Sequence, residues 1–118
     1  QRGAMFIGTN EDTNLPNERG QVPGAGSVIA LVERSTQQEA FYIGKPRRPI
    51  MDAALAKMGL AAEDVAMVGD NYNTDIKAGI NAGTGTLLVY TGISTKEQVA
   101  RQESQPTDQV DSLDDWEV

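Results

Sequence analysis

Short apolar runs alternate along this chain with stretches whose apolar residues lie three or four positions apart. The first pattern is typical of buried strands, and the second is typical of helices that pack one face on a sheet. The runs predict strands at residues 4–8, 40–43, 65–68 and 86–90, and a further short strand near residues 109 and 110. The helical spacing predicts helices over 27–34, from Pro49 to Gly59, from Asn73 or Thr74 to Gly83, and from Ser94 or Thr95.

Local residues refine these elements. Pro49 suits a first helical turn, where its missing N–H costs nothing, and Gly59 stands where a C-cap glycine belongs. The inward face of that helix is expected to carry Ile50, Ala53, Ala54 and Met58. Residues 10–24 contain three Asn, two Pro and two Gly, which predicts a loop. The continuous apolar run 65–68 predicts a strand that is buried on both faces, as in a parallel sheet.

The order of these elements indicates the fold class. Strands alternate with helices, and the connections are long enough for parallel strands joined by helical crossovers. The sequence therefore predicts an α/β fold with a mostly parallel sheet and flanking helices. With 118 residues there is room for one domain with a modest core.

Composition excludes several classes of protein. No apolar run approaches the roughly 20 residues of a membrane helix, so a membrane protein is not expected. The chain has no cysteine, which suits a cytoplasmic protein. The net charge is −7, and all 10 basic residues lie in 1–102 with 11 of the 17 acids, so residues 103–118 carry −6. An acidic surface repels phosphate backbones, so we expect no nucleic-acid partner.

Polar side chains follow three of the predicted strands, at residues 9–12, 44–46 and 69–75. Because ligands bind at the carboxyl ends of parallel strands, Lys45, Asp70 and Asp75 are expected to converge there. Carboxylates suit Mg²⁺, and a lysine beside them can neutralise a phosphate. The chain has no His and no Cys, which excludes a conventional zinc site, a cysteine nucleophile and a histidine base.

These motifs resemble a known family. Gly-Asp-x-x-x-Thr-Asp at residues 69–75, after Gly-Lys-Pro at 44–46, is similar to the last two motifs of the haloacid dehalogenase (HAD) superfamily. Thr-Asn-x-Asp at residues 9–12, followed by Pro16, narrows the likeness to the NagD-like, p-nitrophenyl-phosphatase type. The resemblance covers nearly the whole chain. It implies a Rossmann-like sheet, of which this chain would be the C-terminal half together with the end of the cap domain.

The resemblance also implies roles for individual residues. Members of this type are Mg²⁺-dependent phosphatases that form an aspartyl-phosphate. By that likeness Lys45 holds the nucleophile and the phosphoryl group by charge, and Asp70 binds Mg²⁺. Asp75 would orient the metal's waters or its neighbours. The substrate, a small phosphorylated metabolite, would be met by Asn10, Asp12, Asn71 and Thr74.

Simpler roles remain open for several of these residues. Lys45 could be a solvated turn residue, and Asp70 a turn or capping residue. Asp75 could stabilise a helix N-terminus, and Asn10 and Asp12 could be turn residues that bond their own backbone.

Two parts of the family pattern are missing. The second motif, an apolar strand that ends in Ser or Thr, is absent unless Thr9 fills it, and Asp12 and Pro16 favour the return from the cap for Thr9 instead. The nucleophile motif Asp-x-Asp-Gly occurs nowhere in the 118 residues. The chain therefore looks like the C-terminal part of a longer phosphatase, and alone it is expected to be inactive. By the resemblance, residues 1–20 end the cap and return to the core, 21–104 form the C-terminal half of the core, and 105–118 form an acidic segment.

Two other functions compete with this interpretation. The chain could be a non-catalytic module of HAD-like fold that binds Mg²⁺ or a partner. It could also be a receiver-like phosphoacceptor domain, but a receiver has its acids early and its lysine late, whereas Lys45 precedes Asp70 here. The sequence leaves the physiological substrate and the oligomeric state open.

Overall fold

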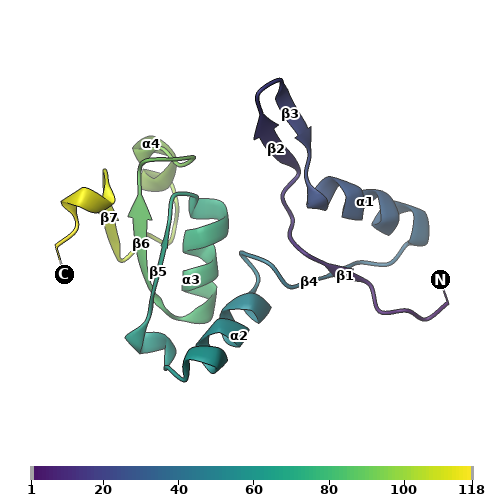
Figure 1. The fold of residues 1–118 in the computed structure, drawn as a ribbon, viewed down its shortest axis with the longest axis horizontal. Coiled ribbons are helices and arrows are strands. Elements are labelled where there is room, and N and C mark those ends of the chain that lie inside the picture. The colour runs from purple at the N-terminus through teal and green to yellow at the C-terminus, as the bar shows by residue number, and fades with distance from the viewer. Residues whose placement is uncertain (1, 118) are drawn as a thin grey trace.

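The computed structural model describes residues 2–117 and has an α/β architecture with flanking helices (Figure 1). Its strands form three small sheets: a parallel β1-β4 pair, an antiparallel β2-β3 hairpin, and a parallel sheet of order β5-β6-β7. The strands are β1 (Ile7–Gly8), β2 (Asn14–Asn17), β3 (Gly20–Pro23), β4 (Phe41–Tyr42), β5 (Ala66–Gly69), β6 (Gly85–Val89) and β7 (Asp108–Val110). The α-helices are α1 (Ala25–Thr36), α2 (Arg48–Met58), α3 (Lys77–Ala82) and α4 (Lys96–Ala100).

Shorter helical segments complete the fold. A π-helix, Tyr72–Ile76, leads directly into α3, and 3-10 turns occupy Ala62–Asp64 and Leu113–Asp115. No helix among residues 2–117 has both the length and the apolar character needed to cross a membrane.

The larger part of the core surrounds the β5-β6-β7 sheet. Ile76, Leu88 and Val99 are the largest fully buried side chains, and with Tyr72 they form one apolar cluster between the π-helix, β6 and α4. A second cluster joins Met51 of α2 to Ala78 and Ala82 of α3. These contacts hold the segment after β5 firmly against the sheet.

The other half of the structure is built around α1. This helix packs on β1, β2 and β3, and Figure 1 shows this group on one side of the molecule and the β5-β6-β7 sheet on the other. The chain passes between the two groups after β4. The division that the sequence predicts between residues 20 and 21 falls within β3, which pairs with β2, whereas the separation visible in Figure 1 falls between β4 and α2. The domain division itself stays a prediction.

The loop predicted for residues 10–24 was wrong in part, because it contains the β2-β3 hairpin. All eight residues of its strands are exposed, so the pattern carries no alternation between apolar and polar positions. The Pro and Asn residues of β2 also favour a loop. Pairing of Asn14 with Pro23 and of Asn17 with Gly20 forms the hairpin nevertheless.

Strand β5 also differs from its prediction. It lies at the edge of its sheet with β6 as its only partner among the described strands, and Val68 is 44% exposed. The strand is therefore not buried on both faces. β6, in contrast, is covered: Leu87, Leu88 and Val89 are all buried. On α2 the buried residue is Met51, whereas Ile50 and Met58 of the predicted inward face are about half exposed.

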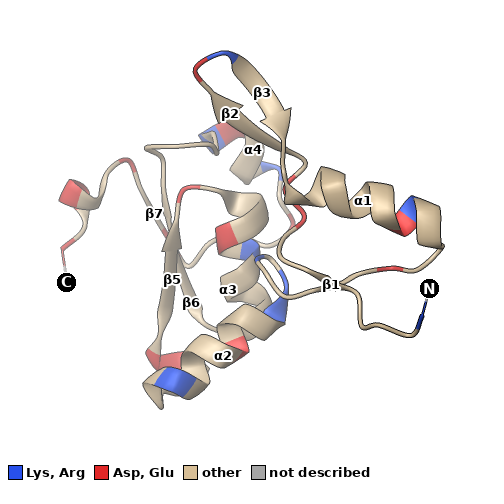
Figure 2. Cartoon of the chain, turned by 45° about the vertical axis from the view of Figure 1, so that its right-hand side comes forward, with Lys and Arg blue, Asp and Glu red and all other residues tan. Residues whose placement is uncertain are grey.

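The C-terminal segment begins within the sheet. The short strand predicted near residues 109 and 110 is confirmed as β7, and Val110 pairs with Val89 of β6. In Figure 2 the segment after β7 carries acidic positions and no basic ones. The acidic residues beyond residue 105 thus include part of a strand as well as a solvated end.

Removing the centre of the core should destabilise this fold. Leu88→Ala is expected to lower the free energy of unfolding by about 2–5 kcal/mol, because a fully buried leucine leaves a cavity. Urea unfolding followed by circular dichroism measures the change. Leu31→Ala is the control, since Leu31 is 69% exposed and its loss should change stability by less than about 0.5 kcal/mol. Equal effects of both variants would contradict the core described above.

Candidate functional site

One cavity of about 420 Å³ contains every residue that the sequence singled out for function. It lies where β1, β4 and β5 end, and we call it the site cavity. The strand ends come from two different sheets, so convergence does not depend on a single continuous sheet. The site cavity is lined by the predicted residues Asn10, Asp12, Lys45, Asp70, Asn71, Thr74 and Asp75.

The segment after β5 sets the positions of the acidic residues. Asn71 is the N-cap of the π-helix, and its side chain accepts a hydrogen bond from the Asn73 N–H at 3.0 Å. The helix therefore begins before Asn73 and Thr74, which the sequence favoured as caps. This earlier start places Asp75 one turn after Asn71, so that its carboxylate points back to the start of the helix.

Lys45 and Asp75 form the central ion pair of the site cavity. The Lys45 Nζ lies 2.6 Å from Asp75 Oδ1, and Asp75 Oδ2 accepts a hydrogen bond from the Asn71 N–H at 3.1 Å. The Asp75 side chain is 8% exposed, whereas that of Lys45 is 43% exposed. Asp75 thus both closes the first helical turn and holds Lys45, and the ammonium group still faces solvent.

Gly69 makes room for this arrangement. A Cβ at Gly69 would lie 2.3 Å from the Asp75 Cβ and 2.4 Å from its Oδ2, which is closer than real Cβ contacts allow. The absence of a side chain at the end of β5 is therefore a condition for the burial of Asp75.

Asp70 is held from the opposite side by the loop after β6. Its Oδ2 accepts a hydrogen bond from the Ile93 N–H at 3.0 Å, and its carbonyl accepts one from the Ser94 N–H at 3.0 Å. Gly92 allows this approach, because a Cβ there would lie 1.8 Å from Asp70 Oδ2. The other carboxylate oxygen, Oδ1, accepts no hydrogen bond from residues 2–117.

Asn10 and Asp12 belong to the segment between β1 and the hairpin. The Asn10 Oδ1 accepts a hydrogen bond from the Asp12 N–H at 3.0 Å, so Asn10 does stabilise its own turn as the simpler interpretation held. Both residues also line the site cavity. Their contact with a substrate stays a prediction.

Sequence reasoning missed several residues around the site cavity. Leu15 and Pro16 line it from the hairpin, and Ile93 lines it from the loop after β6. The position of Ile93 had a usable signal, because the loop after β6 leaves the same carboxyl edge as Asp70. Leu15 had none, since the Asn, Pro and Gly residues of 10–24 favour a loop.

The donor atoms suit a hard cation in part. Among the described residues no group of three or more His, Cys, Asp or Glu side chains is placed to bind a metal. Mg²⁺, however, is usually held through one or two carboxylates, with waters and substrate phosphates as further ligands. Asp70, with a carboxylate oxygen free of protein partners at the edge of the site cavity, fits that pattern.

Comparison with known proteins agrees with this geometry. The model of the HAD-hydrolase-like family matches residues 42–116, which is well over half of the chain. The chain belongs to the HAD family of hydrolases. The resemblance seen in its motifs and the predicted α/β fold are thereby confirmed.

The relatives of this HAD chain are named as a 5'-nucleotidase or as phosphatases. It is 46% identical over 116 residues to the 5'-nucleotidase YutF of Bacillus subtilis, covering 98% of the chain and 45% of the relative. It is 49% identical over 107 residues to an acid sugar phosphatase of Staphylococcus haemolyticus, covering 91% of the chain and 41% of the relative. A double mutant of the thermostable NPPase from Geobacillus stearothermophilus superposes with a TM-score of 0.91 at 50% identity, covering 98% of this chain and 45% of that one. The HAD chain thus spans less than half the length of these relatives.

The role of Gly69 leads to a test of the site. Gly69→Ala should lower the free energy of unfolding by about 1–3 kcal/mol, because the new methyl group displaces the Asp75 carboxylate. Urea unfolding of this variant is compared with Gly85→Ala, where the nearest atom to an added Cβ is 3.5 Å away. The control should retain wild-type stability. Wild-type stability in Gly69→Ala would show that the close approach of Gly69 to Asp75 does not contribute to the free energy of unfolding.

Proposed function

We propose that this chain supplies the phosphate-binding half of the active site of a HAD-type phosphatase that hydrolyses phosphate monoesters of small metabolites. The observation that carries the proposal is the Lys45–Asp75 pair at 2.6 Å, in one cavity with Asp70. The site contains a partly exposed cation, Lys45, which can bind a phosphate group. It also contains an acid with a free carboxylate oxygen, Asp70, which can bind a divalent cation. The names of the relatives support the same reaction class.

The nucleophile in this proposal comes from a segment that precedes the chain in the complete protein. The motif Asp-x-Asp-Gly is absent from the 118 residues. A carboxylate oxygen of that segment would attack phosphorus, the ester P–O bond would break, and the leaving alkoxide would take a proton from water to depart as the alcohol. Water would then cleave the acyl phosphate to release inorganic phosphate and restore the carboxylate.

Lys45 would bind the phosphoryl group by charge. Its Nζ is fixed by Asp75, so it needs little reorganisation when phosphate enters. The attraction increases as the substrate displaces water from the cavity, because the local dielectric constant falls. Asp75 acts through Lys45 as a positioning residue in this scheme. Asn71 and Thr74 would shape the loop, and Asn10 and Asp12, which also line the cavity, would contact the substrate from the segment after β1.

Asp70 would hold Mg²⁺ through the oxygen that is free of protein partners. When bound, the ion supplies positive charge to the phosphate oxygens. The role of the chain is to keep the Asp70 carboxylate in place, and the hydrogen bond from the Ile93 N–H to Oδ2 does so without occupying Oδ1.

The metal assignment is tested at Asp70 in a complete protein that contains this chain. Asp70→Asn should abolish Mg²⁺-dependent turnover of p-nitrophenyl phosphate while the fold is retained, since an amide oxygen can still accept the Ile93 hydrogen bond. Turnover is measured across a Mg²⁺ titration. Asp64→Asn, an exposed acid on the 3-10 turn, is the control and should behave as wild type. Activity in Asp70→Asn with unchanged Mg²⁺ dependence would remove Asp70 from the metal site.

Lys45 offers a test of phosphate binding by charge. Lys45→Ala should reduce turnover about 100-fold or more, on the scale of losing one electrostatic stabiliser. Lys45→Arg should restore only part of the rate, because a planar fork replaces a compact charge. Lys57→Ala, on the exposed face of α2, controls for loss of a positive charge elsewhere. Near-wild-type rates for both Lys45 variants would assign Lys45 to a solvated turn and refute the proposed phosphate site.

A further inference from the structure

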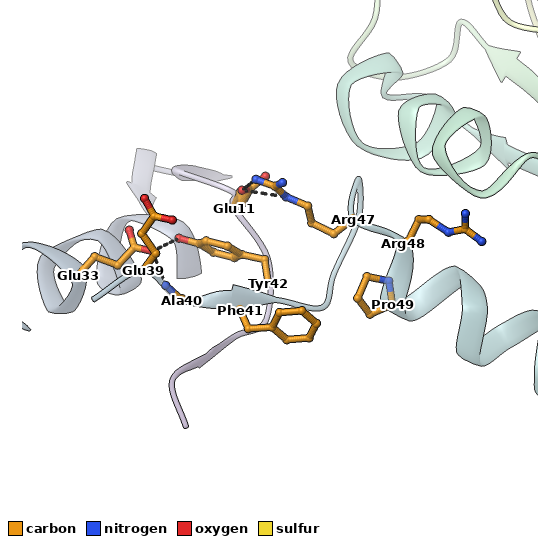
Figure 3. Close-up of a pocket in the computed structure, with 9 residues that line it drawn as sticks. All are labelled: Glu11, Glu33, Glu39, Ala40, Phe41, Tyr42, Arg47, Arg48 and Pro49. Atoms are coloured by element: carbon orange, nitrogen blue, oxygen red, sulfur yellow. Dashed lines mark hydrogen bonds and ion pairs between the residues drawn. The ribbon is translucent and has the colours of Figure 1, made fainter. Parts of the chain in front are cut away.

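A side-chain ion pair links the two groups of elements that Figure 1 shows apart, in addition to the backbone and its hydrogen bond from the Ile50 N–H to the Ile43 carbonyl. Among residues 2–117, Glu11–Arg47 is the single side-chain hydrogen bond or ion pair that joins residues 2–43 to residues 45–117. The Arg47 Nη2 lies 2.5 Å and its Nε 3.2 Å from Glu11 Oε1 (Figure 3). The hydrogen bond to Glu11 raises the pKa of Arg47, as expected for a cation that is stabilised by its partner.

Each partner of this pair is next to residues of the site cavity. Glu11 stands between Asn10 and Asp12, which line that cavity, while its own side chain lines a different cavity of about 520 Å³. Arg47 follows Lys45 by two positions. A displacement of Glu11 or Arg47 would therefore move neighbouring residues that line the site cavity.

Each partner is also anchored in its own half of the structure. On one side the carbonyl of Asp12 accepts a hydrogen bond from the Gly26 N–H of α1 at 2.9 Å. On the other side the carbonyl of Pro46 accepts one from the Asn81 side chain of α3 at 2.8 Å. The Glu11–Arg47 pair thus links two segments that are themselves hydrogen-bonded to helices, one to α1 and the other to α3.

We propose that Glu11 and Arg47 form a clasp that fixes the distance between the two walls of the site cavity. Here the two walls are the lining residues that come from residues 2–43, which include Asn10, Asp12 and Leu15, and those that come from residues 45–117, which include Lys45 and Asp75. The two clasp residues touch no reacting atom in this scheme and act as positioning residues. The effect on substrate rests on the proposed phosphatase function, whereas the mechanical link between the halves does not.

The clasp is partly exposed, which sets the size of its effect. The side chains of Arg47 and Glu11 are 56% and 36% exposed. Exposed ion pairs contribute up to roughly 1 kcal/mol, so opening the clasp should change binding by up to about fivefold. Arg48 provides a matched control, because its ion pair with Asp52 lies within α2 and does not join the halves.

The experiment uses a complete protein that contains this chain and compares Glu11→Gln, Arg47→Gln, the double variant, the charge exchange Glu11→Arg with Arg47→Glu, and Arg48→Gln. Hydrogen exchange at the Asp12 and Gly26 amides should accelerate about threefold in each single Gln variant and no further in the double variant. The charge exchange should restore slow exchange, and Arg48→Gln should match wild type. Failure of the charge exchange to restore protection, or equal effects of Arg47→Gln and Arg48→Gln, would overturn the clasp.

Kinetics provide the second measurement on the same variants. KM for p-nitrophenyl phosphate should rise about threefold to fivefold in the single variants while kcat stays within about twofold. The difference between wild type and the double variant should vanish at about 1 M salt, where the Debye length is near 3 Å. An active wild type with unaltered KM in both single variants would refute the effect on substrate and leave the phosphatase proposal intact. An inactive wild type would refute the phosphatase proposal, and hydrogen exchange would still decide the clasp.

Discussion

The Asp75 carboxylate is buried at the start of the helical segment after β5 and receives donors from two parts of the chain. A buried charge is costly unless it is paired and hydrogen-bonded, so both donors are conditions for its presence. The Asn71 N–H is local, while the Lys45 ammonium comes from 30 residues earlier in the sequence. This one carboxylate therefore ties the loop after β4 to the end of β5 and brings the site together. The burial of Asp75 also requires glycine at position 69, because any side chain there would occupy the space of the carboxylate.

The parts that could be predicted from sequence are those in which burial or a motif leaves a direct pattern. Strand β6 is an apolar run that is covered in the structure, and the site residues follow strand ends. The hairpin could not be predicted, because all its strand residues are exposed and no alternation marks them. The exposure of β5 could not be predicted either, since an apolar run does not reveal how many strands lie beside it.

The open edge of β5 bears on the proposed mechanism. The strand ends at Gly69, next to Asp70, and Val68 is 44% exposed. In the proposal, the segment with the nucleophile has to reach the site cavity near Asp70, and the free edge of β5 leaves space for a further strand there. The relatives, of which this chain covers less than half, are long enough to contain such a segment. The two parts of the complete protein would then have separate roles. The preceding segment would supply the attacking carboxylate, and this chain would bind the phosphate and the metal ion.

That division is the central claim, and an assay of p-nitrophenyl phosphate hydrolysis with Mg²⁺ tests it most directly. The purified chain is compared with the same chain joined to the N-terminal part of the Bacillus subtilis relative. No detectable turnover is expected from the chain alone, because a covalent route without its nucleophile loses several orders of magnitude in rate. The joined protein should turn over at roughly 1 per second or faster. Turnover at that rate by the 118-residue chain alone would require a nucleophile within these residues and would refute the proposed division.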